Sequence, residues 1–302
     1  MRILIPLDGS PLAEQALAPA VILAKHLHPT AALVLASIIR APAIETGLAG
    51  SYAGMSRVTL LDEMVVQATT YLHHTAQLPL LQGVAVNVIV KIGVPTEAIR
   101  TIAQREHIDL IIMTSHGRSG IAQTLWGSVA QSVMRTCGVP TLVLHPHSKT
   151  LFAPNLAQPV TLLVPLDGTL LAEAILPAAI LAATGCGGTL YLVRIVPAPS
   201  DVEALHEAAD YLERLQRQIE AQGIAVRSSV QQGEPVAIIE QLVHQLDPVL
   251  LAMATHGRVG LDQLLHGSMT QTIFHDLGLP LLVVHPVLTP EEATVHALLN
   301  AV

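Results

Sequence analysis

Aromatic residues are scarce in this chain of 302 residues, where they make up 2% of the total. Proteins that bind single-stranded nucleic acids stack the bases on aromatic side chains, and proteins that bind duplexes need a basic surface. The chain has 15 Lys and Arg residues against 23 Asp and Glu residues, which gives a net charge of −8. This composition argues against a nucleic-acid partner.

Cysteines and long apolar runs are scarce as well. Two cysteines cannot form a disulfide framework, which favours a reducing cytoplasm as the location. Hydrophobic residues reach 51%, yet no run approaches the roughly 20 apolar residues of a membrane-spanning helix, so we expect no membrane partner. The 15 histidines lack His-x₃-His spacing, and there is no Cys-rich ligand spacing. We therefore predict no metal site built from protein ligands.

The sequence contains an internal duplication. Residues 2–24 align without gaps with residues 161–183, and both segments contain a Pro-Leu-Asp-Gly sequence. Gly-x-Pro, His-Gly-Arg and Gly-Ser then recur in the same order, first within residues 93–128 and again within residues 233–268. Such self-similarity indicates tandem copies of one fold. We predict a first domain at residues 1–148, a linker at 149–159, a second domain at 160–288 and a C-terminal tail at 289–302.

Short apolar runs alternate with amphipathic stretches in each copy. Predicted strands at 3–7, 33–39, 86–90 and 110–113 are interleaved with helices that include 59–77 and 128–136. The second copy gives strands at 190–196, 226–230 and 250–253 and helices at 202–222 and 268–276. This alternation predicts an α/β fold of two tandem, doubly wound, five-stranded parallel sheets.

Three features of each copy fall where a predicted strand ends. Asp8 and Asp167 follow the first strand, a His-Gly-containing loop follows the fourth, and a Gly-Ser pair opens the last helix. Ligands of open parallel sheets bind beyond the carboxyl ends of the strands. A helix N-terminus with Gly and Ser suits a phosphate, and a carboxylate can accept hydrogen bonds from an exocyclic amine. These features together predict a nucleotide site in each copy.

The loop spacing makes a family resemblance specific. In universal stress proteins a glycine is followed by two residues, a second glycine, nine residues, a third glycine and Ser or Thr. Both copies match this spacing, with Gly117, Gly127 and Ser128 in the first and Gly257, Gly267 and Ser268 in the second. The chain thus resembles a tandem, two-domain universal stress protein over nearly its whole length. The resemblance implies an adenine nucleotide alpha hydrolase-like, Rossmann-like fold.

The resemblance also implies the ligand and its contacts. We expect ATP, with AMP or ADP as alternatives, bound together with Mg²⁺ in up to two clefts. Asp8 and Asp167 would bind the adenine amine, and Pro6 and Pro165 would hold the exit of the first strand near the base. The remaining contacts to base, ribose and phosphates would come from Ile38, Met113, Thr114, Gly117, Gly127, Ser128 and Val129, and from Ile195, Met253, Ala254, Gly257, Gly267, Ser268, Met269 and Thr270.

The first glycine of the loop is replaced in both copies, by Thr114 and Ala254. If that position needs a positive φ, Thr114 is strained, whereas at the end of an extended strand both residues fit. Thr114 is bulkier than Ala254, and Thr270 adds a hydroxyl that the first copy lacks. On these grounds we expect the second copy to bind ATP more tightly than the first.

Single universal stress protein domains dimerise through their last strands. The resemblance therefore implies that Thr141–His145 and Leu281–His285 pair within this chain, with Val143 and Val283 near a pseudo-two-fold axis, and a further homodimer stays open. The chain has no P-loop, dinucleotide loop or nucleophile elbow, so we expect a stress-signalling protein and not an enzyme. Two alternatives are a nucleotide-free scaffold for protein partners and a slow, or autophosphorylating, ATPase.

Overall fold

The computed structural model describes residues 1–27, 30–40, 57–115, 127–145, 159–246, 249–255 and 278–286. The first half contains β1 (Arg2–Pro6), η1 (Ala13–Ala16), α1 (Leu17–Leu27), β2 (Ala32–Ile39), α2 (Arg57–Ala76), η2 (Pro79–Leu81), β3 (Ala85–Ile92), α3 (Pro95–Arg105), β4 (Leu110–Thr114), α4 (Ser128–Thr136) and β5 (Thr141–Leu144). The second half contains β6 (Thr161–Leu166), α5 (Leu170–Glu173), α6 (Leu176–Cys186), β7 (Thr189–Val196), α7 (Val202–Glu220), β8 (Val226–Gln232), α8 (Pro235–Leu246), β9 (Val249–Ala254) and β10 (Leu281–Val284).

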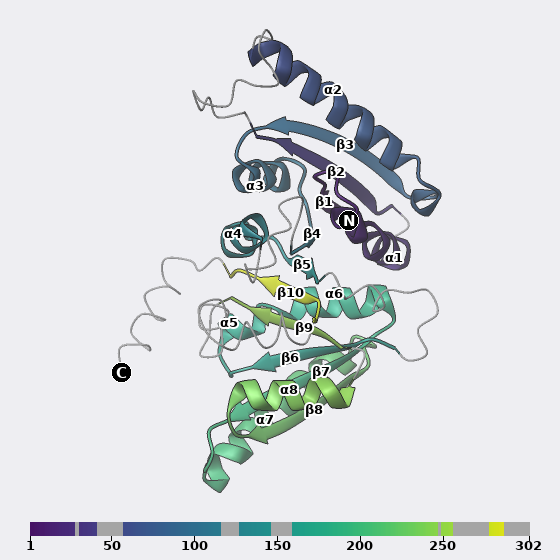
Figure 1. Cartoon of the computed structure of the whole chain (residues 1–302). Coiled ribbons are helices and arrows are strands. Elements are labelled where there is room, and N and C mark those ends of the chain that lie inside the picture. Colours follow the sequence, from purple (N-terminus) through teal and green to yellow (C-terminus); the bar gives the residue numbers. More distant parts are fainter. Residues whose placement is uncertain are drawn as a thin grey trace.

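The strands form one continuous sheet that runs the length of the molecule (Figure 1), in the order β3-β2-β1-β4-β5-β10-β9-β6-β7-β8. All neighbours within a half are parallel, and only β5 and β10 pair antiparallel. The predicted α/β fold class and the predicted pairing of the two last strands are therefore confirmed. Both of these strands are buried and apolar, and an unpaired edge of that kind would promote aggregation.

The register of β5 on β10 places the pseudo-two-fold axis. Leu142 lies opposite Leu282, with Val143 opposite Leu281 and Thr141 opposite Val283. The axis therefore passes between Leu142 and Leu282, and Val143 and Val283 lie one residue to either side of it.

Helices cover both faces of the sheet. One core layer lies beneath α1, α2, α6 and α7, and a second lies beneath α3, α4 and α8. Across the junction α1 contacts α6, and the approach is close: a Cβ added at Gly185 would lie 2.7 Å from Leu23 Cδ2. The two halves are thus joined by a strand pair and by a helix pair.

Ladder pairing extends the strands beyond their predicted ends. β3 was expected at 86–90, but it pairs with β2 at every position from Ala85 to Ile92. The helix expected at 268–276, and most of the Gly- and Ser-rich segment 45–57, lie outside the described residues. Within the described ranges, no helix is both long and apolar enough to cross a membrane.

Candidate nucleotide site

The order of the strands fixes where a ligand site is expected. In the first half β1 lies between β2 and β4, and in the second half β6 lies between β7 and β9. The chain reverses its direction of winding at β1/β4 and at β6/β9, which are the topological switch points of the two sheets. We call the carboxyl ends of the strands around β1/β4 site one and those around β6/β9 site two.

Asp8 organises a tight turn at the end of β1. Its Oδ1 atom accepts hydrogen bonds from the Ser10 backbone N–H at 3.0 Å and from the Ser10 hydroxyl at 2.6 Å. The Ser10 hydroxyl oxygen in turn accepts the Ala13 N–H at 3.1 Å, which begins η1. Gly9 provides the positive φ of 80° that this turn requires.

The same turn follows β6. Asp167 Oδ1 accepts the Thr169 backbone N–H at 2.9 Å and its hydroxyl at 2.6 Å, and Thr169 caps α5 through the Ala172 N–H. Gly168 has a φ of 84°. The two copies of the duplicated sequence therefore form the same turn, with the same three hydrogen bonds. Each aspartate has a structural role as a turn residue, whatever it also does toward a ligand.

The N-terminus of α4 lies at site one. Gly127 is its N-cap residue and has no side chain to cap the helix, while its own N–H donates to the Ser115 carbonyl at 2.6 Å. Ser128 is exposed in the first turn, followed by half-buried Val129. The first-turn N–H groups and the positive end of the helix dipole make this an environment that suits an anion.

The replaced first glycine causes no backbone strain. Thr114 is the last residue of β4 and Ala254 is the last residue of β9, and both are buried. Among the described residues other than glycine, only His107 has a positive φ. Both residues therefore lie at the end of an extended strand, a backbone conformation that any residue can adopt.

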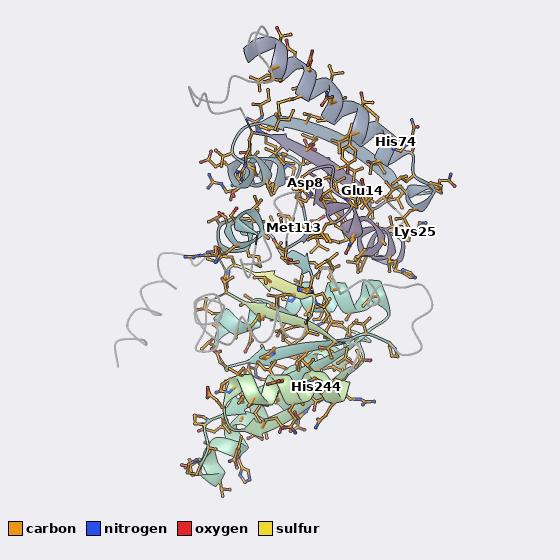
Figure 2. The ribbon with its side chains drawn as sticks, in the orientation of Figure 1. Asp8, Glu14, Lys25, His74, Met113 and His244 are labelled. Carbon is orange, nitrogen blue, oxygen red and sulfur yellow. The ribbon has the colours of Figure 1, made fainter. Side chains whose placement is uncertain are left out.

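The structure places several predicted contacts on one face of the sheet. Ile38, Met113 and Val129 all adjoin the core layer beneath α3 and α4, and Ile195 and Met253 adjoin the corresponding layer of the second half. Pro6 ends β1 next to these residues, and Pro165 occupies the same register position on β6. Figure 2 labels Asp8, in the turn after β1, and Met113, on the neighbouring strand β4.

The remaining predicted contacts cannot be placed. Six of them lie outside the described residues: Gly117, Gly257, Gly267, Ser268, Met269 and Thr270. The loops that would complete both phosphate sites therefore stay predictions, and so does the whole assignment of contacts. The start of the last helix lies within the described residues in the first half, but not in the second.

A tyrosine behind each aspartate turn was not predicted. Tyr71 of α2 donates a hydrogen bond to Glu14 Oε1 at 2.9 Å, and burial together with Glu14 raises the pKa of its phenol. In the second half burial and the charge of Glu173 likewise raise the pKa of Tyr211. The signal was present in the sequence, because both tyrosines occupy the same position of the duplicated long helix.

A hydroxyl and an imidazole meet at the end of β9. Thr255 Oγ1 lies 2.7 Å from His285 Nδ1, and the Thr255 N–H donates to the Val284 carbonyl at 2.9 Å. Thr255 is only 2% exposed. These contacts tie the start of the second glycine loop to β10, the strand that joins the halves.

Comparisons with known proteins agree with the fold. A family model described as the universal stress protein family matches residues 1–145 and 161–285. Universal stress protein MJ0577 of Methanocaldococcus jannaschii is 40% identical over 62 residues, which span 20% of this chain and 38% of that protein. Universal stress protein Mb2028c of Mycobacterium bovis is 26% identical over 186 residues, or 58% of this chain and 61% of that protein. The matches thus span less than two thirds of these relatives.

Solved structures extend the likeness to nearly the whole chain. A universal stress protein from Archaeoglobus fulgidus is 22% identical with a TM-score of 0.70, covering 94% of this chain and 98% of that one. A putative universal stress protein from Pseudomonas aeruginosa is 17% identical with a TM-score of 0.59, covering 94% and 93%. At these identities the likeness supports the fold alone.

Proposed function

The chain belongs to the universal stress protein family, and from this premise we propose that it binds an adenine nucleotide in up to two clefts, at site one and at site two. The nucleotide is ATP, with AMP or ADP as the alternatives. Binding favours one conformation or partner surface of the protein, so the nucleotide acts as a signal through its differential affinity for two states. The proposal assigns no turnover to either site.

One observation carries this proposal. Site one combines, at a single switch point, a carboxylate on a tight turn, apolar side chains on one face, and the N-terminus of a helix whose N-cap residue is a glycine. This arrangement suits a ligand with an amine at one end, a flat apolar middle and an anionic tail, which describes an adenine nucleotide. The Asp turn and the apolar residues recur at site two.

Each described group has a role toward such a ligand. The Asp8 carboxylate accepts a hydrogen bond from the adenine amine, and Ile38 and Met113 contact the base. The N–H groups of Ser128 and Val129 donate to phosphate oxygens at the start of α4. Mg²⁺ would be held mainly by the phosphate oxygens themselves, since it prefers phosphate and water oxygens to an all-protein cage.

A titration of the nucleotide-free chain with Mg-ATP, followed by calorimetry, tests the proposal. We expect saturable heat with a stoichiometry of one or two nucleotides per chain. The absence of heat at millimolar ATP, from protein whose circular dichroism spectrum is that of a folded α/β chain, would contradict it.

A nucleotide-free scaffold is the second candidate. The observation in its favour is that Asp8 and Asp167 each have a complete task as turn residues, so a ligand is not needed to explain them. The scaffold predicts that ATP gives neither heat nor a rise in melting temperature, and that the protein purifies without nucleotide.

A further inference from the structure

The two halves carry different side chains at one position beside the residues expected to contact the base. Gln231 on β8 lies opposite Ile195 on β7 in the register. In the same way, Lys91 on β3 lies opposite Ile38 on β2. Each of the four is the penultimate residue of its strand, so all lie at the carboxyl edge of the sheet. Gln231 and Lys91 are therefore structurally equivalent, but one is a neutral amide and the other is a cation.

Gln231 lies on the face of the sheet that carries the apolar contacts of site two. Ile195 and Tyr191 adjoin the core layer beneath α8, whereas Val230 adjoins the opposite layer. Because side chains alternate along a strand, Gln231 is on the other face from Val230 and shares the face of Ile195. Neighbouring strands are about 4.8 Å apart, so a base that lies against Ile195 also lies beside the Gln231 amide.

Two hydroxyl groups hold this amide in place. Gln231 Nε2 donates to Ser229 Oγ at 3.3 Å, and the Tyr191 hydroxyl donates to the same oxygen at 3.1 Å. Gln231 Oε1 receives no hydrogen bond from any residue that the structure describes, and Nε2 has a second N–H. An acceptor and a donor are thus available side by side at the edge of site two.

This acceptor and donor match one edge of adenine. Adenine presents the 6-amino donor next to the N7 acceptor, and a glutamine side chain forms two hydrogen bonds with this pair. The amine has two hydrogens, so Gln231 and Asp167 can each accept one of them. In guanine the acceptor O6 replaces the amine, and it would face the Oε1 acceptor of Gln231.

The first half offers a different pattern at the same place. The ammonium group of Lys91 has three donors and no acceptor, so with adenine it can donate to N7 alone. With guanine it can donate to both O6 and N7, which is a common lysine contact. The equivalents of Ser229 and Tyr191 in this half are the apolar residues Ile89 and Val34. Nothing in this pattern excludes guanine.

The cation of β7 does not change the pattern at site two, because it lies on the opposite face. Val193 and Ile195 adjoin the layer beneath α8, so Arg194 between them points toward α7. Its guanidinium carbon lies 5.5 Å from the centre of the Tyr211 ring, a cation–π geometry. It also lies close to the turn after β6, since a Cβ at Gly168 would lie 2.1 Å from Nη1. Arg194 is thus placed behind the turn and not beside the base.

We propose that Gln231 is a specificity-determining residue of site two, which forms hydrogen bonds with the 6-amino group and N7 of adenine, and that Lys91 lets site one accept guanine as well. This inference rests on the proposed function. Site two consequently binds ATP and excludes GTP, whereas site one binds both nucleotides.

The hydrogen bonds from Gln231 also make site two the tighter ATP site. Side-chain size gave the same order, but on the ground that the bulk of Thr114 projects toward the ligand. Met113 adjoins the layer beneath α4, so alternation puts Thr114 on the other face, where its register partner Leu144 adjoins the opposite layer. The size difference between Thr114 and Ala254 therefore falls away from the apolar contacts of the ligand, and contacts to the base edge set the order instead.

A structural role for Gln231 must be distinguished from this one. β8 is an edge strand, and the bonds among Gln231, Ser229 and Tyr191 can simply stabilise it. In that case Gln231→Lys would lower the urea midpoint and leave the ratio of the ATP and GTP affinities unchanged. Ser228→Ala is the matched control, because Ser228 is on the same strand but donates to Gln216 of α7 on the opposite face.

The test is a swap between the two halves, with Mg-ATP and Mg-GTP as the probes in calorimetry. In the wild type we expect ATP to fill both sites and GTP to fill site one only. Gln231→Lys should let GTP fill both sites, and Lys91→Gln should weaken GTP binding at site one about 10- to 100-fold. Ser228→Ala should leave the GTP stoichiometry and the ratio of affinities as in the wild type.

The outcomes separate this inference from the proposed function. If both swaps leave the ratio of ATP and GTP affinities unchanged, or if GTP binds to neither site or to both sites of the wild type, the roles of Gln231 and Lys91 are overturned while ATP binding stands. A wild-type chain that binds neither ATP nor GTP would overturn the proposed function and this inference with it.

Discussion

Replacing Asp8 and Asp167 by Asn separates the two roles that these aspartates can have. In each half Oδ1 accepts two hydrogen bonds from the residue two positions later, at 2.6 Å and about 3 Å. An Asn side chain offers the same acceptor, because the backbone N–H and the hydroxyl hold its carbonyl oxygen in the Oδ1 position. The amide NH₂ then takes the place of Oδ2, so that an acceptor becomes a donor.

The expected loss is therefore in binding and not in folding. A hydrogen bond from an amine to a carboxylate contributes about 1.5–3 kcal/mol, so losing it should weaken ATP binding roughly 10- to 100-fold. The turn keeps its bonds, and we expect the free energy of unfolding to fall by less than about 1 kcal/mol. In Asp8→Ala the turn loses both bonds, and for this half-buried group we expect a loss of about 2 kcal/mol.

Calorimetry with Mg-ATP and urea unfolding of the same samples measure both quantities. The single variants Asp8→Asn and Asp167→Asn serve as each other's control, since each should abolish or weaken binding in one half only. If the double Asn variant binds ATP with unchanged affinity, the carboxylates do not contact the base, and the aspartates are turn residues alone.

Three further predictions concern stability. Gly185→Val should lower the free energy of unfolding by about 1–3 kcal/mol, because its Cβ would lie 2.7 Å from Leu23 Cδ2; an unchanged urea midpoint would mean that α1 and α6 do not touch. Gly168→Ala should destabilise more than Gly9→Ala by about 1 kcal/mol in urea titrations, since both have a φ near 80° but only Gly168 lies against Arg194. Burial raises the pKa of the Cys186 thiol from 9.0 to about 11. The unfolded thiol therefore ionises first, and stability should fall between about pH 9 and 11 by at most about 2–3 kcal/mol, a slope that Cys186→Ala removes.

The duplication made much of the fold predictable from sequence. Alternating strand and helix patterns, repeated twice, were enough for the α/β class. The junction between the last strands was predicted from the family resemblance, and the apolar character of both strands agrees with it. The ends of β3 were missed because pairing with β2, and not the apolar pattern, sets its length. The Asp turns were also within reach, since Asp-Gly-Ser and Asp-Gly-Thr bond locally through neighbours in the sequence.

Contacts between residues on different helices and strands could not be predicted from the sequence. Tyr71 meets Glu14 from a helix 57 residues away, and Lys91 becomes a neighbour of Ile38 only through the register of β3 on β2. The repeated position of Tyr71 and Tyr211 hints at the first relation without identifying Glu14 as the partner. The second relation has no sequence signature, since a one-residue shift of register would place Lys91 on the opposite face.

The sequence by itself determined what depends on local bonds and on repetition: the strand–helix alternation, the two aspartate turns with their glycines, and the likeness between halves. Only the tertiary structure decided what depends on pairing and on faces. The register of β5 on β10 centres the pseudo-axis on Leu142 and Leu282, and strand alternation puts Lys91 beside one site and Arg194 behind the other. The physical reason is that side chains alternate along any strand, whereas the pairing and packing of that strand decide which face of the sheet each side chain occupies.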